Sequence, residues 1–207
     1  NGIKIFCPDG TKLSDDQEIE LEKLIDNSKL PLVKSENMGR AQRIDDAGGR
    51  YIEYLKSRMS NSLRLDGLKI VIDCANGAAY KVGPTILWEL GAEVISLNVN
   101  PDGTNVNKNS GSTNPKNLIS TVKRTKADLG IALDGDADRC VLVDDKGRIV
   151  NGDLILGIIA TKWKDKNILK NNTVVGTNMS NSGLEKHLNE NNINFIRADV
   201  GDRNIIK

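Results

Sequence analysis

An apolar, β-branched run followed by a turn, a helical segment and a second apolar run constrains the fold of this chain most strongly. Residues 68–74 read Leu-Lys-Ile-Val-Ile-Asp-Cys, a pattern typical of a strand that is buried on both faces. The Asn76-Gly77 turn leads into a helical segment that ends at Gly91, and residues 94–97 are the next predicted strand. The pattern predicts a β-α-β unit with parallel strands and a right-handed crossover.

The same alternation continues along the chain. The strands predicted after the first unit lie at residues 127–133, 140–143, 148–150, 173–177 and 193–196, and the helices begin near Pro115, Asp153 and Asn181. Residues 140–150 form a hairpin around Asp145-Lys146-Gly147. We therefore predict an α/β fold of repeated β-α-β units, with mixed sheets flanked by helices.

The first sixty residues differ from the rest because they contain helical patterns and little strand pattern. One helix is capped near Ser14, a second covers about 45–58, and the polar residues 60–62 are typical of a linker. We predict three regions, at residues 1–64, 65–165 and 166–207. The chain opens at Asn1 without methionine and stops on apolar residues, so we expect it to be an internal piece of a longer protein.

Composition and charge exclude several classes of protein. Lys and Arg number 29 against 28 Asp and Glu, a net charge of +1, which gives no basic field for nucleic acid. No apolar run is long enough to span a membrane. The cysteines are far apart, none is in a C-x-x-C pair, and His187 is the only histidine, so we expect neither zinc nor disulfides and predict a cytoplasmic protein. Trp88 and Trp163 lie on predicted helices, where we expect them to pack.

An acidic segment directly after the strand at 127–133 is the strongest candidate site. Asp134, Asp136 and Asp138 alternate with Gly135 and Ala137, and Arg139 follows, so three carboxylates can converge on one side of an extended segment. Their repulsion favours a bound cation, and oxygen ligands select a hard ion such as Mg²⁺. Arg139 adds a guanidinium that can hold phosphate oxygens. The alternative role for Arg139 is a structural ion pair with a neighbour such as Asp144 or Asp145.

Other interpretations of this segment stay open. An exposed acidic turn between strands is one, since Asp and Gly are common in turns. An EF-hand fits poorly, because Arg139 and Asp145 stand where that loop needs Gly and Glu. A haloacid-dehalogenase-like phosphatase would use Asp134 as nucleophile and Asp136 as acid, but Asp138 and Arg139 replace the residues that usually follow.

Polar residues elsewhere are weaker candidates. Asn105, Asn107, Ser110, Ser112 and Thr113 lie in a loop that is typical of a surface. On general grounds alone, Lys4 is a solvated charge and residues 201–203 form a solvated turn.

Taken together, these segments resemble the α-D-phosphohexomutases. Residues 134–139 resemble that family's magnesium loop, usually written DGDGDR, with Ala137 in place of the second Gly. The segment that ends at Lys4 resembles the residues after the family's phosphoserine loop, and Val200-Gly201-Asp202-Arg203 resembles its sugar-binding loop. Residues 68–80, 101–113 and 173–185 resemble the phosphoglucosamine mutase branch of the family.

This resemblance implies a function as well as a fold. It implies an isomerase that interconverts glucosamine 6-phosphate and glucosamine 1-phosphate through a phosphoserine outside this chain, for UDP-N-acetylglucosamine and peptidoglycan synthesis. The resemblance also implies that the intact enzyme can form a homodimer and that this chain alone is inactive. The implied roles are Mg²⁺ binding by Asp134, Asp136 and Asp138, catalysis by Lys4 and Arg139, and binding of a hexosamine phosphate by Val200, Gly201, Asp202 and Arg203.

Three departures leave alternatives open. Ala137 replaces Gly, Asn114 stands where the branch often has His or Asp, and Ala198-Asp199 stands where Thr-Lys is usual. The last of these departures leaves the sugar open, and the alternative activity is that of a phosphomannomutase or phosphoglucomutase. A non-catalytic module that binds sugar phosphate is a further alternative.

Overall fold

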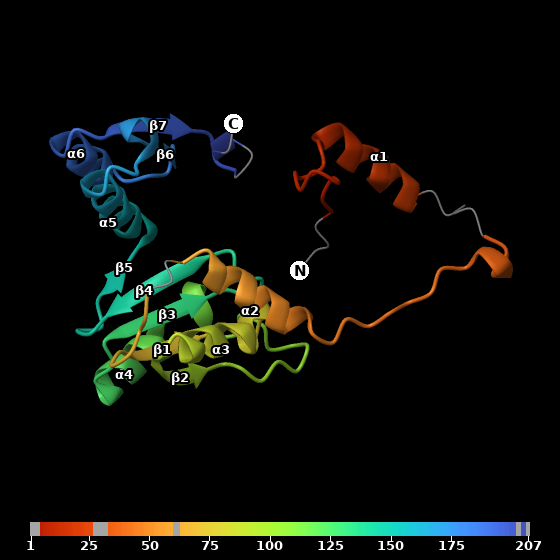
Figure 1. The fold of residues 1–207 in the computed structure, drawn as a ribbon, viewed down its shortest axis with the longest axis horizontal. Coiled ribbons are helices and arrows are strands. Elements are labelled where there is room, and N and C mark those ends of the chain that lie inside the picture. Colours follow the sequence, from red (N-terminus) through yellow and green to blue (C-terminus); the bar gives the residue numbers. More distant parts are fainter. Residues whose placement is uncertain (1–4, 27–32, 60–62, 202–203, 206–207) are drawn as a thin grey trace. The chain divides into compact units, whose positions relative to one another are not determined.

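The computed structural model describes residues 5–26, 33–59, 63–201 and 204–205 (Figure 1). The chain divides into two compact units, Asn1–Tyr51 and Ile52–Lys207. No helix in the described part of the chain has both the length and the apolar character needed to cross a membrane.

The first unit contains α1, Asp15–Asp26, and the short 3₁₀ helix η1, Ser35–Asn37. Ser14 caps α1 as predicted: its hydroxyl accepts from the Gln17 N–H at 3.3 Å, and the Gln17 side chain accepts from the Ser14 N–H at 2.9 Å. No residue of α1 is buried, so the cap and the helix's own hydrogen bonds define it rather than a core.

A helix that crosses the unit boundary opens the second unit. This helix, α2, spans Ala47–Ser57 and buries Ile52. Lys56 ties α2 to the following α/β region, because its ammonium lies 2.6 Å from Glu53 and 2.6 Å from Glu89.

A mixed five-stranded sheet forms the centre of the second unit, in the order β2-β1-β3-β4-β5. Its strands are β1 (Lys69–Asp73), β2 (Glu93–Leu97), β3 (Leu129–Leu133), β4 (Cys140–Asp144) and β5 (Ile149–Val150). The predicted crossover is present, since β1 pairs in parallel with both β2 and β3. The predicted hairpin is also present, since β4 pairs antiparallel with both β3 and β5.

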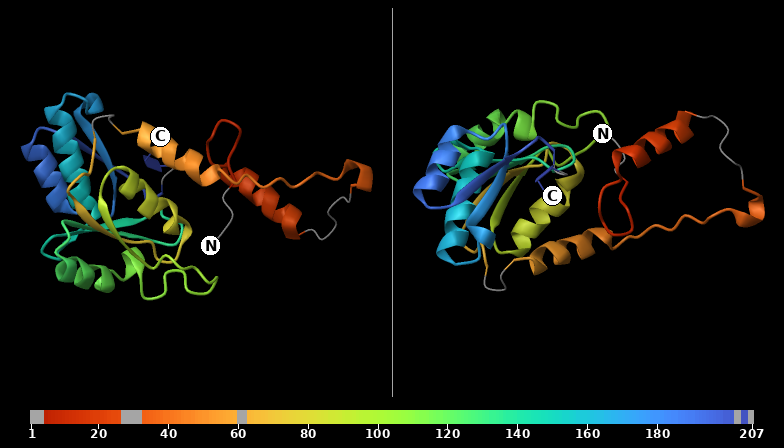
Figure 2. Two further views of the ribbon diagram at one scale, coloured as in Figure 1. Left: turned by 60° about the horizontal axis from the view of Figure 1, so that its bottom comes forward. Right: turned by 90° about the horizontal axis from the view of Figure 1, so that it is seen from above.

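Helices pack on both faces of this sheet. On β1, Val71 belongs to a buried cluster with Leu118 and Val122 of α4 (Lys116–Thr125), whereas Ile72 belongs to a cluster with Ala79. Successive strand residues point to opposite faces, so α4 covers one face and α3 (Val82–Glu89) covers the other (Figure 2). The β-branched run is therefore buried on both faces, as predicted, because a helix packs on each face.

The helix predicted after the Asn76-Gly77 turn begins as a 3₁₀ turn, η2 (Ala78–Tyr80), before α3. The packing predicted for the tryptophans is wrong, because Trp88 is 69% exposed and Trp163 is 49% exposed. Leu87 packs against the sheet. Trp88, one position later, is rotated by roughly 100° around the helix and therefore faces away from it.

A second β-α-β unit follows, as predicted. It consists of α5 (Gly152–Asp165), the short η4 (Lys170–Asn172), β6 (Thr173–Thr177), α6 (Ser182–Glu190) and β7 (Asn194–Ala198). The strands β6 and β7 are parallel. Ala160, Val174, Leu184, Leu188 and Ile193 form its core, and asparagine side chains at Asn151 and Asn181 cap α5 and α6.

Candidate metal centre

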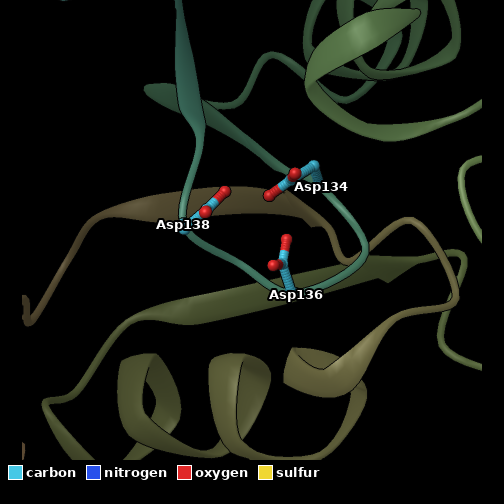
Figure 3. A group of neighbouring side chains, drawn as sticks. All are labelled: Asp134, Asp136 and Asp138. Atoms are coloured by element: carbon cyan, nitrogen blue, oxygen red, sulfur yellow. The ribbon is translucent and has the colours of Figure 1, made fainter. Parts of the chain in front are cut away.

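Three carboxylates converge in the loop between β3 and β4. Asp134, Asp136 and Asp138 can each offer one oxygen, and these oxygens all lie within 4.8 Å of one another. The close-up shows the three carboxylates pointing toward one another across the loop (Figure 3). Asp134 is 1% exposed, and the other two are exposed. This arrangement, one buried and two accessible carboxylates at a strand end, suits a hard cation that also meets a ligand from solvent.

The loop turns tightly because its backbone bonds to Asp134. The Ala137 N–H donates to the Asp134 carbonyl at 3.1 Å, and the Arg139 N–H donates to the Asp134 carboxylate at 3.1 Å. Ala137 has φ of 62°, in the left-handed region where glycine is favoured. An alanine in this conformation costs roughly 1 kcal/mol. The left-handed conformation explains why the DGDGDR pattern has glycine at this position. In this chain the turn is kept with alanine instead of glycine.

Arg139 is held by Asp134. The Arg139 Nε lies 2.8 Å from Asp134 Oδ2 and Nη2 lies 2.7 Å from the same oxygen, whereas Nε is 3.8 Å from Asp138 Oδ1. Asp144, an alternative partner on sequence grounds, pairs instead with Arg148 at 2.6 Å. The Arg139 side chain is 65% exposed, so most of its guanidinium surface faces solvent.

Arg139 also favours the ionised form of Asp134. Burial acts to raise the pKa of Asp134, but the hydrogen bonds from the Arg139 backbone and side chain, with the charge of its guanidinium, outweigh burial and lower that pKa below its ordinary value. Asp134 is therefore ionised at neutral pH. Its carboxylate can serve as a metal ligand without first losing a proton.

The loop at residues 134–139, called the metal loop below for its candidate role, rests on the turn that follows β1. The Ala78 N–H donates to the Gly135 carbonyl at 2.8 Å. At Gly77, an added Cβ would lie 2.3 Å from the Gly135 carbonyl oxygen and 2.6 Å from its Cα. On its other side, an added Cβ on Gly135 would lie 2.6 Å from Val106. The site is therefore built where the carboxyl ends of β1 and β3 meet.

Sequence reasoning missed these supporting residues. The sequence predicts Asn76-Gly77 only as a turn and the polar residues 105–113 only as a surface loop. In the structure Ser110 is 0% exposed, and its hydroxyl has no hydrogen-bond partner within the described part of the chain. The signal available in the sequence is that each segment lies in the connection that follows a strand of the same predicted sheet.

The structure describes only some of the remaining predicted site residues. Lys4, Asp202 and Arg203 lie outside the described residues. Val200 and Gly201 follow β7, on the two-stranded sheet, and Val200 is 66% exposed. The structure thus gathers the three aspartates with Arg139.

A cavity of about 600 Å³ lies between α5 and α6 and is lined in part by Leu154, Ile158, Thr161 and His187. None of the three aspartates lines it. His187 lies on α6, with a ring nitrogen 3.1 Å from the Thr161 hydroxyl.

Two models of protein-family domains match this chain. The model of the phosphoglucomutase/phosphomannomutase α/β/α domain II matches residues 49–147, and that of domain III matches residues 151–207. The chain belongs to the phosphoglucomutase/phosphomannomutase family. The second match includes α5, and the boundaries predicted at 64/65 and 165/166 stay predictions.

Phosphoglucosamine mutases are among the curated relatives of this chain. The one from Zymomonas mobilis is 55% identical over 207 residues, and that from Bradyrhizobium sp. strain ORS 278 is 52% identical over 208 residues. Each alignment covers 100% of this chain and 46% of the relative, so the chain spans about half the length of these relatives.

A solved family structure supports the fold. A phosphoglucomutase/phosphomannomutase family protein from Burkholderia thailandensis has a TM-score of 0.74 at 24% identity, covering 93% of this chain and 41% of that one. At this identity, the similarity shows that the two chains share an architecture and nothing about substrate. The predicted α/β fold is confirmed.

Proposed function

We propose that this chain provides the metal loop and part of the sugar site of a phosphoglucosamine mutase, which interconverts glucosamine 6-phosphate and glucosamine 1-phosphate. The observation that carries the proposal is 55% and 52% identity to curated phosphoglucosamine mutases along the whole chain. The aspartate cluster supports the proposal, because it supplies the negative oxygen ligands that this chemistry needs.

The donor set fits a magnesium ion. Three carboxylate oxygens within 4.8 Å of one another can be bridged by one hard cation, and Asp134 is already ionised. We propose that Asp134, Asp136 and Asp138 hold Mg²⁺. When bound there, Mg²⁺ neutralises negative charge on the oxygens of the transferred phosphoryl group.

Arg139 is proposed to hold the phosphoryl group. Its Nε and Nη2 are fixed on Asp134, so the guanidinium has one orientation, and the exposed part of the side chain can donate to phosphate oxygens. A group oriented in advance stabilises a transition state without having to reorganise during the reaction.

The remaining roles are proposed on sequence resemblance. Lys4 is proposed to assist proton transfer at the accepting hydroxyl, and Val200, Gly201, Asp202 and Arg203 to contact the sugar. The phosphoserine of the family is assigned to no residue of this chain. We further propose a cytoplasmic enzyme that forms a homodimer and serves peptidoglycan precursor synthesis.

Substrate preference tests the proposed function. The purified enzyme containing this chain, supplied with Mg²⁺ and a trace of sugar bisphosphate, is assayed with glucosamine 6-phosphate, glucose 6-phosphate and mannose 6-phosphate. We expect kcat/KM for glucosamine 6-phosphate to be at least about tenfold higher, a difference of about 1.4 kcal/mol. Equal or faster turnover of glucose or mannose phosphate supports a phosphoglucomutase or phosphomannomutase instead. Release of inorganic phosphate, with a trapped acyl phosphate on Asp134, supports a phosphatase.

The role of Arg139 can be separated from stability. In Arg139→Lys, the charge beside Asp134 is kept but the planar fork is lost, so we expect turnover to fall by roughly tenfold or more. The melting temperature should fall only slightly, because lysine keeps a positive charge beside the buried Asp134 carboxylate and the exposed arginine side chain buries little apolar surface. Arg148→Lys, which alters the hairpin pair with Asp144, is the control and should retain full turnover. Unchanged turnover of Arg139→Lys excludes the catalytic role, and so does a loss of turnover that only follows a lower melting temperature.

A further inference from the structure

A second buried carboxylate, Asp73, lies at the carboxyl end of β1. It is 0% exposed, and its side chain accepts hydrogen bonds from three segments of the chain. Oδ1 accepts from the Ala75 N–H at 2.9 Å and from the Asn98 side-chain amide at 2.9 Å. Oδ2 accepts from the Gly111 N–H at 3.0 Å. The carboxylate thus joins the turn after β1, the residue after β2 and the loop that contains Gly111.

The segments bonded to Asp73 are the ones that touch the metal loop. Gly111 has φ of 68°, and an added Cβ there would lie 2.2 Å from the carbonyl oxygen of Leu133, the residue before Asp134. The same Cβ would lie 2.6 Å from the Ala75 methyl group. Gly111 therefore fits between the turn after β1 and the start of the metal loop, and its amide is held there by Asp73.

A further hydrogen bond joins the loop at Asn107 to the turn after β1. The Asn107 N–H donates to the Ala75 carbonyl at 2.9 Å, and the Asn107 side chain lies against Gly135, whose added Cβ would be 2.9 Å from it. Ala75 has φ of 52°, a left-handed conformation that alanine adopts at a cost. The bond from the Ala75 N–H to Asp73 offsets this cost and keeps the turn in place.

The chemistry of the position favours a carboxylate. An ionised carboxylate is an acceptor at both oxygens, so it can serve three N–H donors at once. An asparagine of the same shape has one acceptor oxygen, and its amide hydrogens would face an N–H donor at the other position. Burying a carboxylate is costly unless it is hydrogen-bonded, so this residue stabilises the fold only when all three donors are in place.

We propose that Asp73 is a positioning residue for the metal centre: its carboxylate holds residues 75–78 and 107–111 against the loop that carries Asp134, Asp136 and Asp138. This inference rests on the proposed metal site. Residues that orient metal ligands through a hydrogen-bonded layer typically change metal affinity by 10- to 100-fold when they are replaced. For Asp73→Asn, which acts through the backbone, we expect Mg²⁺ to bind about tenfold more weakly.

The test compares Asp73 with Asp128, the residue that precedes β3. Asp128 is exposed and accepts the Lys69 N–H at 2.8 Å, at the opposite end of β1, so Asp128→Asn makes the same chemical change at a carboxylate that bonds to β1 away from the metal loop. Mg²⁺ is titrated calorimetrically into the protein and both variants. Amide hydrogen exchange is measured at Ala137 and Arg139, whose N–H groups bond to Asp134. We expect Asp73→Asn to weaken Mg²⁺ binding and speed exchange at both amides, and Asp128→Asn to do neither.

The outcomes separate this inference from the metal site itself. If the unaltered protein binds Mg²⁺ and Asp73→Asn leaves both affinity and loop exchange unchanged, the positioning role is wrong and the metal site stands. If the unaltered protein binds no Mg²⁺, the metal site is wrong, and exchange at Ala137 and Arg139 alone decides the role of Asp73. Should Asp73→Asn not fold, Asn98→Ala removes one donor, and unchanged affinity and exchange in that variant overturn the inference.

Discussion

Replacing Asp136 by alanine is expected to weaken Mg²⁺ binding by this protein strongly. Asp136 supplies one of the three oxygens that lie within 4.8 Å of one another, and the remaining two carboxylates would have to bind the ion with Arg139 still paired to one of them. We expect the dissociation constant to rise at least about 100-fold, or about 2.7 kcal/mol, in calorimetric titrations.

The matched control is Asp145→Ala. Asp145 is an exposed aspartate in the β4–β5 turn, so its loss changes the net charge equally without touching the cluster. We expect this variant to bind Mg²⁺ as the unaltered protein does. Undiminished binding by Asp136→Ala removes the site from the loop, and equal losses in both variants show that net charge, rather than coordination, governs binding.

Replacing Gly77 by alanine is expected to destabilise the second unit and distort the metal loop together. Gly77 has φ of −102°, which alanine also adopts, so any effect comes from contact rather than from backbone conformation. The added methyl group would lie 2.3 Å from the Gly135 carbonyl oxygen, a backbone atom that cannot rotate away. We expect the free energy of unfolding to fall by roughly 3 kcal/mol and Mg²⁺ affinity to fall with it.

Gly152→Ala controls for the loss of a glycine. Gly152 begins α5, and an added Cβ there meets nothing within 4 Å. This variant should be neutral or slightly more stable in chemical denaturation, because alanine favours the helix. A Gly77→Ala protein with unchanged stability and unchanged Mg²⁺ affinity contradicts the close packing of the two turns.

Local patterns in the sequence predicted most of the fold because they depend on neighbouring residues. The run that ends at Asp73 contains β-branched side chains on alternate faces, and each face meets a helix. Asn151 and Asn181 cap their helices through bonds to residues two or three positions later. The hairpin turns at Gly147, whose φ is 76°. Each of these features depends on residues that lie only a few positions apart in the sequence.

The support of the metal loop could not be predicted in the same way. The contact between Gly77 and Gly135 joins residues that are far apart in the sequence, and neither glycine differs locally from an ordinary turn residue. The sequence predicts Asp73 only as a residue of the strand at 68–74, because its partners Asn98 and Gly111 come from later loops. A polar residue that closes an otherwise apolar strand is the one local sign of such a role.

The sequence predicted which residues form the candidate site, but it did not decide which residue pairs with Arg139. The alternation of Asp134, Asp136 and Asp138 predicted their convergence. The sequence left Arg139 between a phosphate contact and an ion pair with Asp144 or Asp145, whereas the structure pairs it with Asp134. Spacing cannot decide this, because the turn at Ala137 brings Arg139 back over the start of the loop.

The position of a bound ion tests the central claim most directly. Crystals of the protein grown with Mn²⁺, which takes the same oxygen ligands as Mg²⁺ and scatters anomalously, locate the metal without reliance on activity. We expect one anomalous peak between Asp134, Asp136 and Asp138, with an oxygen from each carboxylate on the ion. A fully occupied peak elsewhere in the protein, or no peak among these carboxylates at saturating Mn²⁺, contradicts the assignment of this loop as the metal centre.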